Sequence, residues 1–523
     1  MPLRPTLPDI AVVMLTLAFG AACAAFVRQP ELASFADDSV SYLVMAQVFS
    51  PYQRASDAVA AAFSREAFYP PLFPLLLALA GAAHDIAWAH ALSALVLAAS
   101  LPWVYALGVR WLDNRWAAAL AAMCVALLPS MWVNTKGILS EPLFCALLLA
   151  SLWVVEREGE GRRKTGILAV LFAAMALTRA AGLIMVGFHA LWASTRRGRS
   201  WSENTPALWP AASACIAYAA WIYLRPAETA DDYMRVVLEL IRGTIASEHP
   251  WAALGDSLLR QATAVAEAWV GSLVVFWVEG RPLRVILAAT VGCLALAGLA
   301  LRLRAGKADA WMMAGYLALY LAWPFYAEMG RYLFPVLPVL VLYAFQALAA
   351  ALRALGRPAG LAHGLIALLM LSLTVPAMAF IQQRASAQGR YPGITDWYRT
   401  PDLAEARARA DVHLNLFADM DAIKALTRPE HRVMWVAPAY VALLADRRGI
   451  RAPAAGLSPD DYRRAVQQAM PDYVFLSAYH PRDTLDDTAW RTGMRALDGY
   501  GAIVHARTRA GGTIVTSVLI RAE

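Results

Sequence analysis

Two adjacent carboxylates, Asp37 and Asp38, stand directly before an amphipathic segment that contains Tyr42 and Leu43. They follow the first hydrophobic segment of the chain, and because ionised side chains avoid the bilayer core, we expect the pair at the water interface. A carboxylate partly withdrawn from water has a raised pKa and can take a proton from a sugar hydroxyl as a general base. The alternatives are a cation ligand, an interface anchor, or a cap for a helix that starts near Ser39.

Glu141 is the second acidic candidate, in the sequence Lys136-Gly-Ile-Leu-Ser-Glu141-Pro. Ser140 suits a helix N-cap, Glu141 suits the positive end of the helix dipole, and Pro142 suits the first turn. Glu141 therefore either stabilises the start of a helix or orients an acceptor and assists Asp38. The two roles are compatible.

Four basic residues, Arg65, Lys136, Arg179 and Arg331, stand at the same ends of hydrophobic segments as these acids. A cation aimed at phosphate oxygens would stabilise a departing lipid phosphate. We favour Lys136 and Arg331 for this role. Each cation could instead reach lipid headgroups, and Arg331 could pair with Glu328.

Metal and nucleotide chemistry find little support in the sequence. His249 is a lone histidine, more typical of a surface residue than of a catalyst or metal ligand, and no His, Cys and Asp cluster has metal-ligand spacing. The five cysteines lie in or beside hydrophobic stretches without a CxxC pair and are interpreted as packing residues. There is no G-x-x-x-x-G-K-[ST] and no G-x-G-x-x-G fingerprint, so nucleotide hydrolysis and a Rossmann pocket are unsupported.

The composition is that of a polytopic membrane protein. Of 523 residues, 59% are hydrophobic and only 16% are charged, with a mean hydropathy of +0.48, whereas soluble proteins keep about a quarter of their residues charged. The net charge of +7, from 46 basic and 39 acidic residues, comes largely from short loops between apolar segments. It therefore sets orientation and does not indicate a nucleic-acid partner.

Apolar runs of about 20 residues predict a mainly helical fold with about eleven spanning helices. The first run is interpreted as an uncleaved helix and not as a signal peptide. Arg179 interrupts one run, which predicts a hairpin with Arg179 at its turn or, alternatively, one long tilted helix. The predicted spans are about 9–28, 86–108, 116–134, 139–155, 165–178, 181–194, 206–224, 283–301, 309–327, 332–352 and 361–381.

Five basic clusters fall on one side of this topology, beginning at Arg110, Arg157, Arg196, Arg302 and Arg353. The positive-inside rule makes that side cytoplasmic. We therefore expect an integral protein of the bacterial inner membrane, with its N-terminus in the cytoplasm and its C-terminal domain in the periplasm.

The acids gather on the opposite, outer side, in a first long loop at about 29–73 and a second at about 225–282. The second is amphipathic around Trp251 to Trp277 and either lies along the interface or contains an extra pair of crossings. We place the membrane domain at 1–384 and a small outer α/β domain at 385–523. In the latter we predict helices at 403–426, 439–445 and 460–470, strands at 432–436 and 472–476, and a closing strand pair at 501–507 and 513–520.

Five motifs in order resemble the GT-C membrane glycosyltransferases, in particular the protein O-mannosyltransferase and lipid A aminoarabinose transferase-like group. The resemblance covers about residues 10–380. The matching stretches are Asp38 to Ala46, Tyr69 to Leu75, Leu139 to Phe144, Leu177-Thr-Arg179-Ala-Ala-Gly182 and Gly330-Arg-Tyr-Leu-Phe-Pro335.

The resemblance implies an inverting transfer of a sugar from a polyprenyl-phosphate donor to a glycan, lipid or protein acceptor on the outer face of the membrane. It implies that the first-loop aspartate is the base, and alignment on Tyr42 favours Asp38 over Asp37. It places Glu141 at the family's second acidic site. No cofactor is required, and a divalent cation is left open. We assign Tyr42, Tyr69, Tyr332 and His249 to the substrate lining. A lipid-linked glycan transporter or a non-catalytic scaffold is the alternative function.

Overall fold

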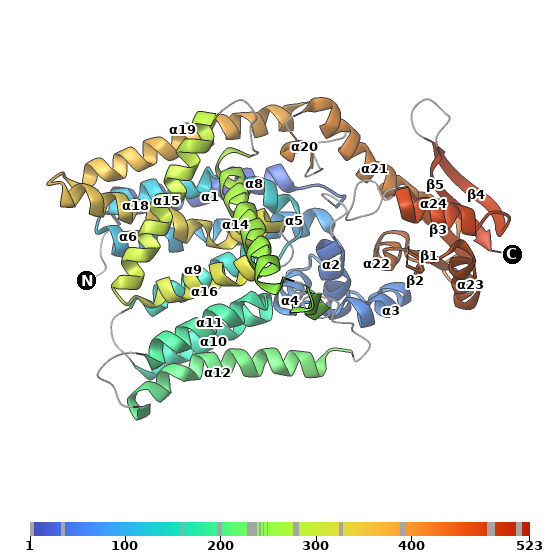
Figure 1. The fold of residues 1–523 in the computed structure, drawn as a ribbon, viewed down its shortest axis with the longest axis horizontal. Coiled ribbons are helices and arrows are strands. Elements are labelled where there is room, and N and C mark those ends of the chain that lie inside the picture. Colours follow the sequence, from blue (N-terminus) through green and yellow to red (C-terminus); the bar gives the residue numbers. More distant parts are fainter. Residues whose placement is uncertain are drawn as a thin grey trace.

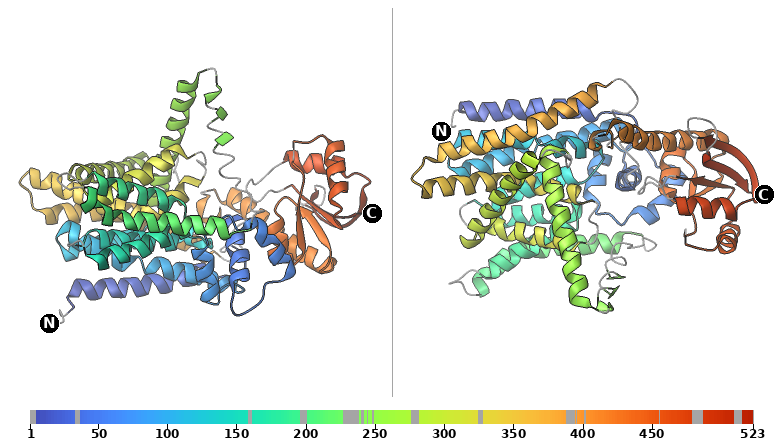
Figure 2. Two further views of the ribbon diagram at one scale, coloured as in Figure 1. Left: turned by 90° about the horizontal axis from the view of Figure 1, so that it is seen from below. Right: turned by 45° about the horizontal axis from the view of Figure 1, so that its top comes forward.

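The computed structural model is a bundle of long helices joined at one end to a small sheet domain (Figures 1 and 2). The N-terminus lies at the end of the bundle farthest from the sheet domain, and the C-terminus lies in that domain (Figure 1). The structure describes residues 5–32, 37–157, 161–195, 201–226, 238, 239, 242, 243, 245–247, 249–275, 282–323, 328–387, 394, 396–400, 402–454, 456–478, 487–508 and 515–522.

In the described residues, each of the predicted spans coincides with a helix or a broken helix, which confirms the polytopic helical architecture. Among the described residues, five helical segments are long and apolar enough to cross a membrane, or six if α7 and the helical stretch Pro129–Lys136, bent by 53°, form one span. The bundle helices are α1 (Leu7–Val27), α5 (Ile86–Ala98), α6 (Leu101–Leu112), α7 (Arg115–Ala126), α8 (Pro129–Val133), α9 (Glu141–Val155), α10 (Arg162–Thr178), α11 (Ala181–Ser194), α12 (Trp201–Leu224), α15 (Pro282–Arg304), α16 (Ala308–Ala322), α17 (Met329–Leu333), α18 (Leu337–Ala354) and α19 (Ala359–Ser386).

The hairpin at Arg179 is confirmed, and the single long helix is wrong. α10 ends at Thr178 and α11 begins at Ala181, and the amide of Gly182 donates to the carbonyl of Arg179 at 2.9 Å. A Cβ on Gly182 would lie 2.9 Å from the backbone of Met175, so glycine permits the close approach of the two helices. Arg179 is thereby fixed at the tip of the hairpin.

Ion pairs tie the helix ends at the N-terminal end of the bundle. Arg115, at the start of α7, donates to Asp9 at 2.9 Å. Arg302, near the end of α15, contacts Glu156 at 2.7 Å and Asp309 at 2.6 Å. These contacts join loops that were predicted to lie on the same, cytoplasmic side of the membrane.

Two short helices, α2 (Asp37–Phe49) and α3 (Asp57–Glu66), lie in the predicted first outer loop, and a third, α4 (Leu72–Leu79), begins where that loop was predicted to end. α2 is buried over most of its length, and its Tyr42, Leu43 and Val44 belong to one hydrophobic core with Trp435 and Val441 of the sheet domain. The helix that begins at the acidic pair is therefore held partly by the C-terminal domain.

The second predicted outer loop contains the helix α14 (Pro250–Val274), which packs against α15 and α17. Trp251 at its start is 85% exposed, as expected for an aromatic side chain at an interface. Trp277 lies outside the described residues.

The C-terminal domain is a five-stranded mixed sheet with strand order β2-β1-β3-β5-β4. β1 pairs in parallel with β2 and β3, and β5 pairs antiparallel with β3 and β4. Breaks in register interrupt the β4–β5 ladder between Ile503 and His505 and between Arg507 and Thr508. The elements are α20 (Asp396–Arg399), α21 (Leu403–Leu426), β1 (Arg432–Trp435), α22 (Pro438–Tyr440), the π-helix η4 (Val441–Ala445), β2 (Arg448–Arg451), α23 (Pro459–Ala469), β3 (Tyr473–Ser477), α24 (Asp487–Ala496), β4 (Gly501–Thr508) and β5 (Val515–Ala522).

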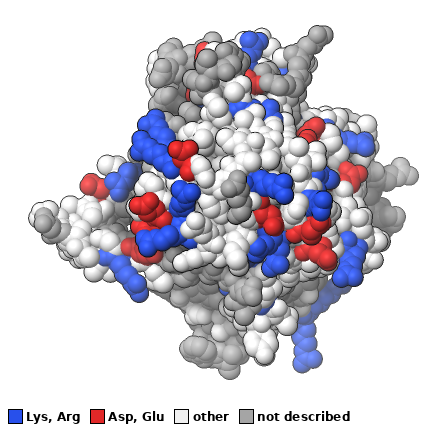
Figure 3. Space-filling view, turned by 90° about the vertical axis from the view of Figure 1, so that its right-hand side faces the viewer, with Lys and Arg blue, Asp and Glu red and all other residues white. Residues whose placement is uncertain are grey.

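The prediction for this domain omitted β2 and α24 and treated α22 and η4 as one helix. Figure 3 views the molecule from the sheet-domain side, where acidic and basic side chains are interspersed.

Candidate active site

Four of the acids and bases singled out in the sequence meet at the end of the bundle nearest the sheet domain. Arg331 of α17 bridges two carboxylates, with Nη2 donating to Asp38 Oδ2 and Nε donating to Glu141 Oε1. Arg179 Nη1 lies 2.7 Å from the same Glu141 oxygen. We call these four residues, Asp38, Glu141, Arg179 and Arg331, the ion-pair cluster. Two guanidinium groups balance two carboxylates, so the cluster is neutral overall.

Asp38 lies in the first turn of α2, and its second oxygen is also occupied. The hydroxyl of Tyr69, in the turn before α4, donates to Asp38 Oδ1. Burial raises the pKa of Asp38, but the charge of Arg331 and the hydrogen bond from Tyr69 outweigh burial, so the pKa lies below its usual value. The sequence predicted a raised pKa, and that prediction is wrong because Arg331 was not recognised as a partner. The side chain of Asp37 lies outside the described residues.

Glu141 begins α9, as predicted, and its side chain is only 1% exposed. Its Oε1 forms ion pairs with both Arg179 and Arg331. Its buried Oε2 has no hydrogen-bond partner within the described part of the chain. An unsatisfied buried carboxylate oxygen is costly. Glu141 can therefore accept a further donor without losing either arginine.

Ser140 does not cap α9, which corrects the prediction. Its side chain makes no capping hydrogen bond to the backbone of α9. Instead its Oγ lies 2.9 Å from the hydroxyl of Tyr42 and 3.2 Å from Nη1 of Arg179. Ser140 thus connects α2 to the tip of the α10–α11 hairpin beside the ion-pair cluster.

Aromatic side chains lie beside residues of the ion-pair cluster. Tyr332 stacks on Tyr320 with ring centroids 4.8 Å apart and lies 6.0 Å from the guanidinium of Arg179. The ring of Tyr42 packs against Tyr69 at 4.9 Å. Tyr42 and Tyr332 are buried and Tyr69 is half-buried, so all three contribute rings to the wall of the cluster.

Three predicted site residues lie away from these contacts. Lys136 is 1% exposed, donates to the Phe26 carbonyl at 2.8 Å, and places its ammonium over the rings of Phe26 and Tyr398. Arg65 is exposed in the last turn of α3, and His249 is exposed just before α14. The ion pairs of Arg331 in the described residues are with Asp38 and Glu141, not with Glu328. The sequence could not indicate these partners, because Asp38 and Arg331 stand 293 positions apart.

No group of three or more His, Cys, Asp or Glu side chains with metal-binding geometry occurs among the described residues. Cys23, Cys124 and Cys145 are buried packing residues, whereas Cys215 and Cys293 are exposed on their helices.

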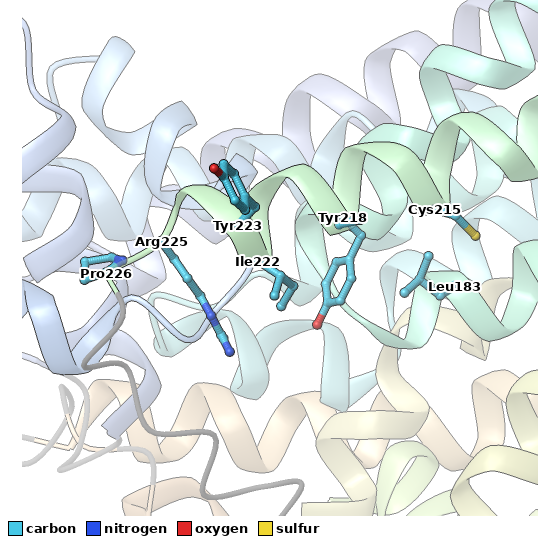
Figure 4. Close-up of a pocket in the computed structure, with 8 residues that line it drawn as sticks. Leu183, Cys215, Tyr218, Ile222, Tyr223, Arg225 and Pro226 are labelled. Carbon is cyan, nitrogen blue, oxygen red and sulfur yellow. The ribbon is translucent and has the colours of Figure 1, made fainter.

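An open groove of about 710 Å³ lies between α11 and α12. Tyr218, Ile222 and Arg225 project into it from one side of α12, and Leu183 faces them from α11 (Figure 4). Leu183 lies toward the Cys215 end of the groove, and Arg225 lies toward the other end (Figure 4). The groove is apolar over most of its length and basic at the Arg225 end.

Comparison with known proteins gives structural neighbours alone. No protein-family model matches the chain, and no curated protein matches it in sequence. ArnT from Cupriavidus metallidurans bound to undecaprenyl phosphate aligns over 97% of each chain with a TM-score of 0.54 and 13% identity. The apo form of the Archaeoglobus fulgidus oligosaccharyltransferase aligns over 99% of this chain and 76% of its own, with a TM-score of 0.51 and 13% identity. Together with the helical bundle and the small sheet domain, these similarities show that the chain is an integral membrane protein with the GT-C glycosyltransferase fold.

Proposed function

We propose that this protein transfers a sugar, with inversion, from a polyprenyl-phosphate donor to a glycan, lipid or protein acceptor at the outer face of the membrane. The observation that carries the proposal is the position of Asp38, held by Arg331 and Tyr69 at the end of the bundle nearest the sheet domain. A carboxylate beside two arginines offers a base for the acceptor and cations for the phosphate. Both groups are needed for an inverting displacement at an anomeric carbon.

In this reaction Asp38 takes the proton from the acceptor hydroxyl or amine as the acceptor attacks the sugar. The bond between the anomeric carbon and the phosphate oxygen breaks, and the phosphate leaves with an additional negative charge. Arg331 and Arg179 stabilise that charge electrostatically, which requires no proton donor because a phosphate is already a good leaving group. Tyr69 orients the base.

The groove between α11 and α12 suits the isoprenoid chain of the donor. Its apolar lining follows α12 from Cys215 to Arg225, about 15 Å at the rise of an α-helix. Arg225 supplies a positive charge at one end of this lining, where an amphipathic lipid would place its phosphate. With the ion-pair cluster at the outer face of the membrane, the N-terminus is cytoplasmic, in accordance with the positive-inside rule.

The test is sugar transfer by purified protein from a panel of polyprenyl-phosphate sugars. We expect turnover with one donor class and a loss of about 10²–10⁴-fold in Asp38→Asn, because the base is removed. Asp57→Asn, which neutralises an exposed acid in the same outer region, should retain activity. Transfer that survives Asp38→Asn would exclude Asp38 as the base. Chelator added to the same assay tests for a divalent cation.

The groove is tested separately with Ile222→Trp, which fills it without touching the ion-pair cluster. We expect transfer from long-chain donors to fall more than transfer from donors with a one- or two-isoprene chain. Equal losses for both donors would contradict the assignment of the groove. Movement of intact lipid-linked sugar without transfer would instead support a transporter.

A further inference from the structure

Both oxygens of the proposed base are occupied in the structure. Tyr69 donates to Oδ1 of Asp38, and Arg331 donates to Oδ2. A carboxylate that faces a guanidinium and accepts two hydrogen bonds is a weak base. Asp38 therefore has to lose at least one of these contacts to take a proton.

Arg331 is the contact that can be exchanged. Its Nε donates to the buried Glu141, while its Nη2 donates to Asp38. The guanidinium fork is rigid and carries five N–H donors, so one edge can stay on Glu141 while another edge changes partner. The unpartnered Oε2 of Glu141 offers a further acceptor for Arg331 during the exchange.

We propose that Arg331 exchanges Asp38 for the donor phosphate and so couples activation of the base to departure of the leaving group. This inference rests on the proposed function and specifies the role of one residue in it. The acceptor oxygen or nitrogen bonds to the anomeric carbon, the bond from that carbon to the phosphate oxygen breaks, and the acceptor proton passes to Asp38. Asp38 becomes neutral as the phosphate gains a negative charge. Besides Glu141, Arg331 therefore has one anionic partner at each stage, first Asp38 and then the phosphate.

The charges of the ion-pair cluster favour such an exchange. Its two guanidiniums are already neutralised by Asp38 and Glu141, so a phosphate that enters competes with Asp38 for Arg331. The sugar-linked donor carries one phosphate charge, and the lipid phosphate product carries up to two. Competition from an ionised Asp38 then weakens retention of the product and favours its release once Asp38 has passed on its proton.

The test measures binding of undecaprenyl phosphate to the purified full-length protein, which requires no donor sugar and no turnover. If Asp38 competes for Arg331, Asp38→Asn should bind undecaprenyl phosphate at least about fivefold more tightly than wild type. When Asp38→Asn is combined with Arg331→Gln, it should not increase the affinity for undecaprenyl phosphate. Asp57→Asn should bind as wild type does.

Each outcome is decisive for the exchange. A gain from Asp38→Asn that persists in Arg331→Gln would mean simple repulsion between carboxylate and phosphate, and would overturn the exchange. No gain from Asp38→Asn would overturn it as well. If Arg331→Gln does not fold, as judged by its thermal unfolding, Arg331→Lys replaces it, because lysine is a point charge without the fork. In the Arg331→Lys background, Asp38→Asn should increase the affinity for undecaprenyl phosphate less than it does in wild type. An equal increase in both backgrounds would contradict the proposal. Absence of any lipid-phosphate binding would count against the proposed function itself.

Discussion

The hydroxyl of Tyr42 lies 2.9 Å from Oγ of Ser140, which joins the helix that carries Asp38 to the turn that introduces Glu141. The two residues stand 98 positions apart in the chain. The same Ser140 oxygen accepts a hydrogen bond from Arg179. One buried polar contact therefore fixes the relative position of three of the elements that form the ion-pair cluster.

Tyr42→Phe should remove this contact while keeping the ring against Tyr69 and Phe73. We expect a loss of about 1 kcal/mol in the free energy of unfolding, together with a lower rate of transfer. Ser140→Ala should have a similar effect, and the double variant should lose less than the sum, because the two side chains share one interaction. Thermal unfolding of the three variants in detergent measures this coupling, and strict additivity would argue against it.

Tyr69→Phe should change the pH dependence of transfer. Arg331 and the Tyr69 hydrogen bond hold the pKa of Asp38 below its usual value, against burial. The proposed base is active when ionised, so kcat/KM should fall as the pH drops through the pKa of Asp38. Loss of the Tyr69 hydroxyl removes one group that favours the ionised form. The pKa then rises, and the acid limb of the kcat/KM profile moves to higher pH. A limb that stays in place or moves to lower pH would contradict the assignment of Asp38.

Glu141→Gln should destabilise the protein strongly. The side chain is buried and accepts from Arg179 and Arg331, so neutralising it leaves two guanidiniums with one carboxylate. Removal of one partner from a buried ion pair costs about 3–5 kcal/mol. Glu405→Gln is the matched control, because its pair with Arg409 is half exposed and should contribute less than about 1 kcal/mol. Unfolding midpoints that fall equally in both variants would contradict the prediction.

Two buried valines of the sheet domain should differ in their effect on transfer. Val441 packs in the core shared with α2, whereas Val474 packs on the opposite face of the sheet. Val441→Ala and Val474→Ala should each cost about 1–3 kcal/mol of stability. Only Val441→Ala should also lower kcat, because it loosens the support of the helix that holds Asp38. Equal kcat values in the two variants, measured well below their unfolding temperatures, would show that the sheet domain does not position the base.

Local patterns predicted the helices well. The predicted helix at 403–426 matches α21 (Leu403–Leu426), and Arg179 divides its hairpin where the charge interrupts the apolar run. Such features depend on the periodicity of nearby residues, which a single sequence displays directly.

The strand β2 and the helix α24 were not predicted, because each contains a glycine that weakens its local sequence pattern. β2 contains Gly449, where a Cβ would lie 2.2 Å from the carbonyl oxygen of Pro438, so the strand requires glycine to pack beneath α22. α24 contains Gly493, where a Cβ would lie 2.9 Å from Leu476 of β3. In both cases a residue that weakens a local pattern permits a close tertiary contact.

The partners inside the site were also beyond local inference. The sequence indicated Asp38, Glu141, Arg179 and Arg331, and the structure brings all four together. The sequence could not indicate which carboxylate each arginine pairs with, or that Lys136 donates a hydrogen bond to the carbonyl of Phe26. These contacts arise from packing of distant segments, which neither composition nor spacing encodes.

The breaks in the β4–β5 register have a consequence for solubility. β4 forms one edge of the sheet, and α3 packs against β2 at the other edge. An exposed edge strand can recruit a strand from another molecule, and irregularities in its pairing twist it away from such recruitment. We therefore expect the two register breaks in β4 to disfavour edge-to-edge pairing of this domain with another molecule.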